Sequence, residues 1–297
     1  MSAIDLTRML GIRYPIVAAP MFLISDVDMV VGVSEAGGLG TFPALNYRTT
    51  EQFREAIRAI KSRTAAPFGV NLILLGNPRL EADLKVCLEE GVPLLITSLG
   101  NPTAVIQAAH AHGIKVFCDV IGLKHAQKCA AVGADAVIAV SAGAGGHAGT
   151  ISPFVLVPFL KRHLSIPVLA AGGISDGRGM AAALSLGASA VYLGTRFIAT
   201  EESPAPEGYK EMILQAAPED IEYSPEVSGH PANFLRSSLE KFRASGENAE
   251  RRPSAWKDVW SAGQGVGLID EVLSCRAVIE KLISEYEAVR RALPTFG

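Results

Sequence analysis

Short runs of apolar residues alternate with longer amphipathic stretches along the first two thirds of the chain. Each run has the length of a buried strand, and the stretches between the runs have helical spacing. Several helical stretches end in a glycine just before the next run, which lets the chain turn from helix into strand; these are Gly91, Gly113, Gly133 and Gly187. The pattern predicts eight strands, at residues 16–19, 39–41, 68–72, 94–97, 115–118, 136–140, 166–171 and 190–193.

Strands that alternate with helices predict an α/β fold with a parallel sheet. Eight such units in about 200 residues fit a closed (β/α)8 barrel, the TIM barrel, better than a doubly wound sheet. The doubly wound sheet remains the alternative. The fold class predicted from the pattern is therefore a TIM barrel.

Residues 201–262 interrupt the alternation. The segment begins near a Ser-Pro-Ala-Pro sequence and contains two amphipathic stretches, at 207–216 and 233–242. We interpret it as a helical segment inserted after the eighth strand, near the active-site mouth; the alternative is a peripheral subdomain without a catalytic role. Residues 1–200 and 263–297 then form the barrel, and a last helix at 268–293 closes it.

Composition narrows the class of protein. A chain that is 49% hydrophobic and 19% charged favours a compact enzyme over a disordered regulator. A net charge of −3 without a basic stripe argues against nucleic acid as a partner. The N-terminus lacks the apolar part of a signal peptide, and no uncharged run reaches the ~18 residues of a membrane span. We expect a cytoplasmic protein with reduced cysteines and a small-molecule substrate; a homo-oligomer is an open alternative.

The residues that follow the predicted strands are informative as a set, because the active sites of TIM barrels lie in those loops. The loops after the seventh and eighth strands commonly bind phosphate in this fold, and here both carry glycine turns. They predict a phosphate site, unless the glycines only make tight turns. The strand-end residues are Pro20, Met21, Asn71, Ser98, Asp119, the loop around His147, Gly172, Gly173, Gly194 and Thr195.

His147 is the strongest candidate for catalysis. It lies in a strand-end loop of glycines and alanines, where little surrounds an imidazole except a ligand. A histidine in such a place suits a general base or a hydrogen-bond donor to a developing anion. We expect no metal, because no second ligand stands nearby at ligand spacing. The other histidines, His110, His112, His125, His163 and His230, are expected to be structural or merely exposed.

These motifs together resemble the nitronate monooxygenases, formerly called 2-nitropropane dioxygenases. The resemblance covers nearly the whole chain, and the motifs keep their order and spacing. A Gly-Gln-Gly sequence near the C-terminus belongs to it, which we interpret as a turn back to the barrel mouth with Gln264 near the ligand. The motifs are residues 17–21 (VAAPM), 69–71 (GVN), 144–149 (AGGHAG), 171–177 (AGGISDG), 194–197 (GTRF) and 263–265 (GQG).

The resemblance implies non-covalent FMN at the mouth of the barrel and an enzyme that oxidises alkyl nitronates, with O2 as co-substrate. It places Pro20, Met21 and Asn71 along the isoalloxazine, with Gly145 close to it. His147 would face the substrate, where it removes the α-proton of a neutral nitroalkane or bonds the nitro group. The residues implied for the ribityl phosphate are Ala171, Gly172, Gly173, Gly194 and Thr195.

Asp119 departs from this pattern, because it stands where some relatives place a lysine near the flavin. A nearby anion would disfavour a negatively charged reduced flavin. Asp119 either points away from the cofactor, or this branch differs in its electron donor.

Two other functions stay open. Related FMN enzymes with the same glycine–histidine loop take hydride from NAD(P)H and reduce enoyl thioesters or quinones. A barrel that binds a phosphate ligand without flavin is the other alternative, and it would be colourless when purified.

Overall fold

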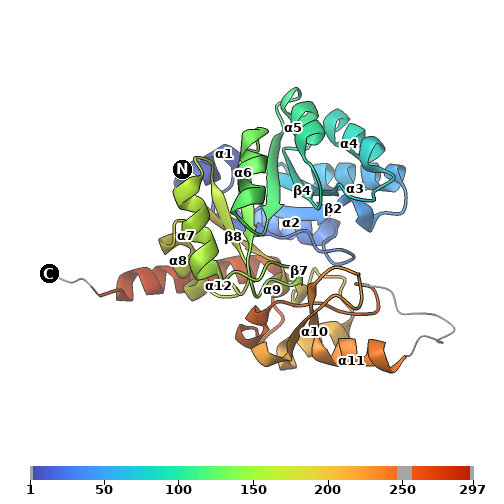
Figure 1. Ribbon diagram of the computed structural model, residues 1–297. Coiled ribbons are helices and arrows are strands. Elements are labelled where there is room, and N and C mark those ends of the chain that lie inside the picture. The colour runs from blue at the N-terminus through green and yellow to red at the C-terminus, as the bar shows by residue number, and fades with distance from the viewer. Residues whose placement is uncertain (1–2, 246–255, 295–297) are drawn as a thin grey trace.

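The computed structural model describes residues 3–245 and 256–294. Eight parallel strands form one sheet in the order β1-β9-β8-β6-β5-β4-β3-β2 (Figure 1). A parallel bridge from Val17 to Leu39 links its two edges, so the sheet curls into a nearly closed barrel. The predicted TIM barrel is confirmed, and each predicted run contains a strand. The strands are β1 (Ile16–Ala18), β2 (Gly40–Pro43), β3 (Phe68–Ile73), β4 (Leu94–Ser98), β5 (Lys115–Val120), β6 (Ala136–Val140), β8 (Val168–Ala171) and β9 (Ala190–Leu193).

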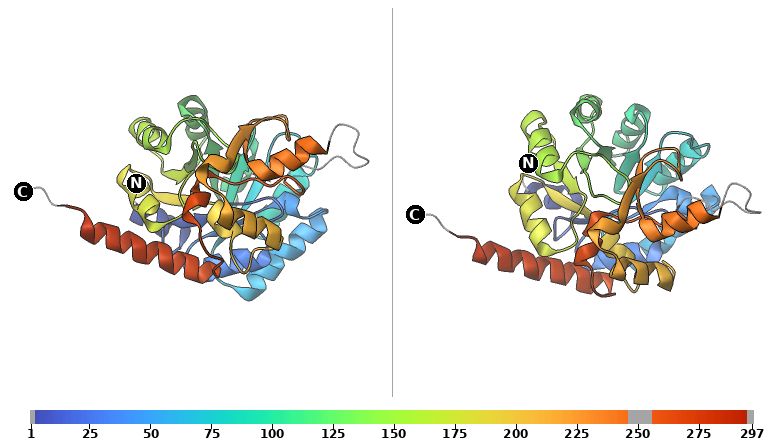
Figure 2. Two further views of the ribbon diagram at one scale, coloured as in Figure 1. Left: turned by 90° about the horizontal axis from the view of Figure 1, so that it is seen from below. Right: turned by 60° about the horizontal axis from the view of Figure 1, so that its bottom comes forward.

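Helices surround the strands, as Figure 2 shows in its right-hand view. The last helix is shorter than expected: it begins at Cys275 and not at 268, because the Ser274 hydroxyl accepts a hydrogen bond from the Ala277 amide and caps the helix there. The helices are α1 (Ala3–Leu10), α2 (Val27–Glu35), α3 (Thr50–Arg63), α4 (Leu80–Glu89), α5 (Thr103–His110), α6 (Leu123–Ala131), α7 (Pro153–His163), α8 (Gly177–Ser185), α9 (Thr195–Ile198) and α12 (Cys275–Ala292).

Two apolar layers hold the barrel together. One fills its interior, where side chains such as Ile96, Phe117 and Leu169 meet and are fully buried. The other lies between the strands and the surrounding helices. The four cysteines are buried and free, as expected of small core residues. No helix among the described residues is long and apolar enough to cross a membrane.

The inserted segment contains strands as well as the predicted helices, and the helix predicted at 233–242 begins only at Arg236. Residues 233–235 continue a strand, because they pair with β10 on one side and with the loop of His147 on the other. Residues 246–255 of the segment lie outside the described residues. The elements are α10 (Glu207–Gln215), β10 (Ile221–Ser224), β11 (Ala232–Leu235) and α11 (Arg236–Ala244); β11 pairs with the two-residue strand β7 (Gly146–His147).

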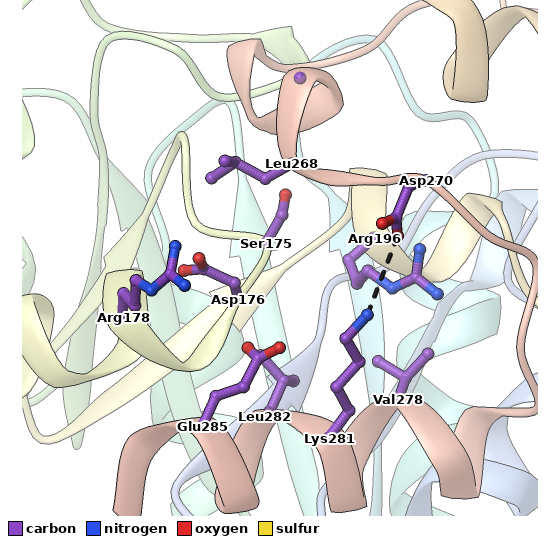
Figure 3. Close-up of a pocket in the computed structure, with 11 residues that line it drawn as sticks. Ser175, Asp176, Arg178, Arg196, Leu268, Asp270, Val278, Lys281, Leu282 and Glu285 are labelled. Carbon is purple, nitrogen blue, oxygen red and sulfur yellow. Dashed lines mark ion pairs between the residues drawn. The ribbon is translucent and has the colours of Figure 1, made fainter. Parts of the chain in front are cut away.

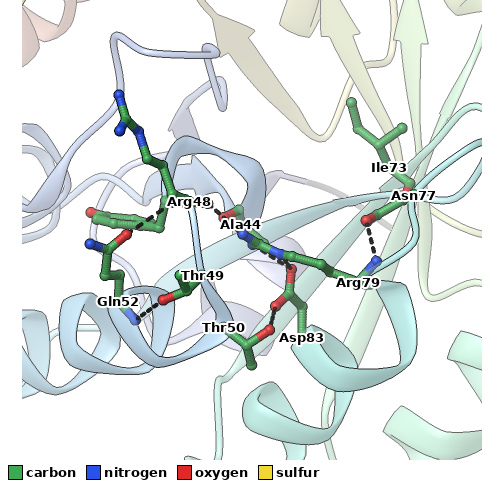
Figure 4. Close-up of polar contacts among 10 residues, drawn as sticks. Ala44, Arg48, Thr49, Thr50, Gln52, Ile73, Asn77, Arg79 and Asp83 are labelled. Carbon is green, nitrogen blue, oxygen red and sulfur yellow. Dashed lines mark hydrogen bonds and ion pairs between the residues drawn. The ribbon is translucent and has the colours of Figure 1, made fainter.

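A buried ion pair supports the loop that follows β2 (Figure 4). The Asp83 carboxylate is fully buried and binds the Arg79 guanidinium at 2.7 Å, with a further hydrogen bond from the Thr50 hydroxyl. Arg79 also donates to the carbonyl oxygens of Ala44 and Tyr47. These bonds satisfy the buried charges and fix the loop at the carboxyl end of the barrel.

Candidate active site

A cavity of about 770 Å³ opens at the carboxyl ends of the barrel strands. Its walls are mostly apolar, and no Lys or Arg occurs among the described residues that line it. Gln264 is not part of the lining; it is exposed, and its amide donates to the carbonyl oxygen of Gly143. The structure brings every predicted site residue together on this wall: Pro20, Met21, Asn71, Asp119, Gly145, His147, Ala171, Gly172, Gly173, Gly194 and Thr195.

One end of the cavity is built from the turns after β8 and β9. Gly173 has a φ of +69°, and a side chain added there would meet no protein atom within 4 Å, because it would enter the cavity. The Thr195 hydroxyl oxygen accepts a hydrogen bond from the Gly263 amide at 2.9 Å, which leaves its hydrogen to be donated. The Ser175 hydroxyl is buried without a partner in the described protein. This end offers hydrogen-bond donors to an anion without a basic side chain.

A chain of three polar side chains crosses the cavity wall at the ends of β3, β4 and β5. The Asn71 amide nitrogen donates to the Ser98 hydroxyl at 2.7 Å, and Ser98 donates to one Asp119 oxygen at 2.5 Å. The other Asp119 oxygen is buried and has no partner in the described protein. Asp119 lines the cavity. The alternative that it points away from the cofactor is therefore removed.

Burial raises the pKa of Asp119 to about 6, against the lowering effect of the Ser98 hydrogen bond and of His125. The carboxyl group is then partly protonated at neutral pH. Only the protonated fraction is an uncharged donor, and at pH 7, about one unit above this pKa, it is roughly a tenth of the molecules, so most of the repulsion of an anionic ligand remains.

His147 lines the same cavity from β7, which pairs with β11 of the inserted segment. Its ring is half-buried and makes edge contacts with Trp256, at a centroid distance of 5.3 Å, and with His230, at 6.0 Å. Its Nε2 lies 3.1 Å from the Ser228 hydroxyl oxygen. Burial and the neighbouring His230 lower the pKa of His147, so the imidazole is neutral at pH 7 and able to accept a proton.

Comparison with known proteins decides the family. A sequence model described as "Nitronate monooxygenase" matches residues 4–83 and 75–285. The chain belongs to the nitronate monooxygenase family. It is 28% identical to a solved nitroalkane oxidase from Streptomyces ansochromogenes, with a TM-score of 0.83 over 99% of this chain and all of that one. The chain is thus an oxidoreductase of a flavin-dependent family.

Other relatives of this chain carry different names. FabK from Thermotoga maritima has 38% sequence identity and a TM-score of 0.88, over 97% of each chain. A (3aS,4S,5R,7aS)-5-hydroxy-7a-methyl-1-oxo-octahydro-1H-indene-4-carboxyl-CoA dehydrogenase from Rhodococcus jostii is 36% identical over 239 residues. That alignment covers 79% of this chain but 66% of the relative, just under two thirds of its length.

The cavity fits the flavin that the nitronate monooxygenase family requires. The open space at Gly173 and the unpartnered Ser175 hydroxyl match a phosphate at one end. The unpartnered Asp119 oxygen is a polar group on the wall that a bound ring system with hydrogen-bonding edges would satisfy. Met21, whose sulfur lies close to Gly194, supplies an apolar part of the cavity wall.

Sequence reasoning missed part of this family member's site. His230 is exposed, as predicted, but the sequence did not indicate that both His125 and His230 line the cavity. Tyr209, Tyr223 and Trp256 also line the cavity, and they come from the inserted segment. Nothing in their local sequence marks them, because their position depends on how that segment folds back over the barrel.

A smaller cavity of about 280 Å³ lies between α8, α9 and α12, and Ser175 lines it as well (Figure 3). Its charged groups largely satisfy one another: Lys281 binds Glu271 at 2.7 Å, Glu285 accepts from the Gly177 amide, and Asp176 caps α8. The Arg196 guanidinium donates to the carbonyl oxygen of Glu271. We interpret these contacts as structural, because they tie α12 to the loops that form the phosphate end.

Proposed function

We propose that this protein is an FMN-dependent oxidoreductase that oxidises alkyl nitronates, and neutral nitroalkanes more slowly, with O2 as co-substrate. FMN, when bound, would supply the two-electron redox chemistry. The observation that carries the proposal is a neutral, half-buried His147 on the wall of an apolar cavity whose turns after β8 and β9 offer donors to a phosphate. The family and the nitroalkane oxidase likeness support it.

Different residues of this chain would bind the cofactor and transfer the proton. Gly172, Gly173, Gly194 and Thr195, together with Ala171, would line the phosphate. The donors would be the Thr195 hydroxyl and backbone amides other than that of Gly173, which already donates to the carbonyl oxygen of Gly143. Pro20, Met21, Asn71, Asp119 and Gly145 would line the ring system. His147 would take the α-proton from the carbon of a neutral nitroalkane, and the electron pair of the broken C–H bond would remain in the nitronate. The apolar walls would keep water from competing for the imidazole.

Oxygen uptake by the cofactor-loaded protein tests this proposal. We expect uptake when a primary nitronate such as ethyl nitronate is added, and slower uptake with nitroethane at the same pH. An absence of uptake with either compound, from protein that carries a full complement of FMN, would reject the proposal. A colourless protein that binds no FMN would favour the flavin-free alternative instead.

A second candidate function is oxidoreduction of an acyl thioester with NAD(P)H or NAD(P)+. The likenesses to FabK and to the carboxyl-CoA dehydrogenase favour it. The apolar rim of the cavity, which includes the half-exposed Phe22, Leu99 and Ile121, suits a substrate with an apolar body. Oxidation of NADH or NADPH that depends on an added enoyl thioester, with no oxygen uptake from nitronates, would select this function.

A further inference from the structure

Ser228 reaches His147 from the inserted segment, although 81 residues separate the two positions in the sequence. It lies between β10 and β11, the strand that pairs with the loop of His147. Its hydroxyl oxygen is 3.1 Å from Nε2 of His147 and 3.0 Å from the carbonyl oxygen of His230. Ser228 therefore contacts both a side chain on the cavity wall and the backbone beside it.

The two contacts of Ser228 determine where the hydrogens lie. A hydroxyl group has one hydrogen to donate, and a carbonyl oxygen can only accept. Ser228 therefore donates to His230, and its own oxygen accepts a hydrogen bond from Nε2 of His147. The neutral imidazole carries a single ring hydrogen, so Nδ1 keeps a free lone pair. None of the described residues forms a hydrogen bond with Nδ1, so it is available to a ligand.

We propose that Ser228 is a positioning residue: it holds the His147 ring with Nε2 protonated and leaves Nδ1 as the atom that takes the α-proton of a neutral nitroalkane. This inference rests on the proposed function. The proton moves from carbon to Nδ1, and the C–H electron pair stays on the nitronate. A nitronate has already lost that proton, so its oxidation does not need an oriented base.

The two substrate forms therefore separate the role of Ser228 from a general structural one. In cofactor-loaded protein, we expect Ser228→Ala to lower kcat/KM for nitroethane about five- to tenfold, the usual effect of one hydrogen bond. The kcat/KM for ethyl nitronate should stay within about twofold, and Ser228→Thr should restore the nitroethane value. Equal losses on both substrates, no loss on either, or no rescue by threonine would overturn the proposal.

A matched control comes from the same inserted segment. Ser237 is exposed on α11, and its hydroxyl contacts the Met212 sulfur. Ser237→Ala should leave both kcat/KM values unchanged. A nitroethane-specific loss in this variant as large as that of Ser228→Ala would overturn the assignment of the effect to Ser228.

A spectroscopic measurement tests which nitrogen of the His147 ring is protonated without requiring catalytic turnover. The ¹⁵N spectrum of the His147 ring, assigned by its loss in His147→Ala, should show a protonated Nε2 and an unprotonated Nδ1 at pH 7. A protonated Nδ1 would overturn the proposal. If neither nitro compound is oxidised, the proposed function fails, while this spectrum still reports whether Ser228 orients the ring.

Discussion

Two parts of the cavity wall, the phosphate end at the turns after β8 and β9 and the His147 end at the loop of His147, are built in different ways. The phosphate end consists of backbone turns and short side chains that follow two neighbouring barrel strands, β8 and β9. The His147 end depends on side chains from a segment inserted after the barrel, which pairs with β7 and places His230 and Trp256 against the imidazole. The first end is part of the barrel itself, whereas the second exists only once a distant segment has folded over it.

This difference suggests a division between binding and selectivity. A phosphate site made largely of backbone and short hydroxyl side chains on the barrel turns tolerates change in the insertion, because few of its donors come from elsewhere. A base whose surroundings come from an insertion can be retuned by changes in that insertion alone. We therefore expect variants at the phosphate end to affect cofactor binding, and variants at the His147 end to affect turnover of neutral nitroalkanes.

The largest effect is expected from His147→Ala. Loss of a general base should slow nitroethane turnover by about 10²-fold or more, while FMN remains bound. Steady-state kinetics and the visible absorbance of the purified variant measure both properties. His163→Ala is the control, because His163 is exposed on α7 and bonds its own helix. Nitroethane turnover that is unchanged in His147→Ala would remove this residue from the mechanism.

A substitution at the phosphate end should affect cofactor binding instead. Gly173→Val places a side chain in the space that the phosphate needs, and we expect FMN affinity to fall about 10- to 100-fold through lost hydrogen bonds to the anion. Fluorescence titration of the apoprotein measures this affinity.

Gly113 offers a matched control for the backbone strain. It has a φ of +72° and equally open space, but it lies on the turn before β5 and does not line the cavity. Gly113→Val should leave FMN affinity unchanged. Equal losses in both variants would mean that strain, not the phosphate site, explains the result.

Asp119 should affect how the free energy of unfolding depends on pH. Its pKa is raised from 3.8 to about 6 in the folded protein, so the folded state binds more protons in that interval. The stabilisation from Asp119 is full below pH 3.8 and is lost as the pH rises through about 6. Relative to Asp119→Asn, the wild-type apoprotein should lose about 1–2 kcal/mol of unfolding free energy between pH 4 and pH 7. Urea denaturation at several pH values measures the difference, and parallel curves would contradict it.

The smallest effect is expected where the insertion touches the loop of His147. The Tyr223 hydroxyl donates to the carbonyl oxygen of Ala148 at 2.9 Å. Tyr223→Phe removes this bond and should lower nitroethane kcat/KM up to about fivefold, with FMN affinity unchanged. Tyr286→Phe on α12, outside the cavity lining, serves as the control. A change in FMN affinity alone would contradict the proposed division between cofactor binding at the phosphate end and turnover at the His147 end.

The same division explains what could be predicted from the sequence. The barrel strands and the glycine turns at Gly172, Gly173 and Gly194 are local signals, because hydrophobic runs and glycines mark them directly. His147 could be singled out because its neighbours are small. Ser228, His230 and Trp256 could not, since only the pairing of β7 with β11 brings them to the cavity.

The helix predicted at 233–242 was wrong in its first three residues for the same reason: long-range strand pairing decides the structure there. Residues 233–242 have helical spacing, yet the first three belong to β11, because hydrogen bonds to β10 and β7 on either side outweigh local helical preference. The orientation of Asp119 was likewise open, since a strand-end residue can face the cavity or the helices.

Anaerobic reduction of the FMN-loaded protein tests the central claim most directly. Ethyl nitronate, NADH and NADPH would be added separately while the visible absorbance of the flavin is followed. We predict that the nitronate alone bleaches the absorbance and that admitted O2 restores it. Rapid bleaching by NADH or NADPH, with none by the nitronate, would contradict the account and favour oxidoreduction of an acyl thioester instead.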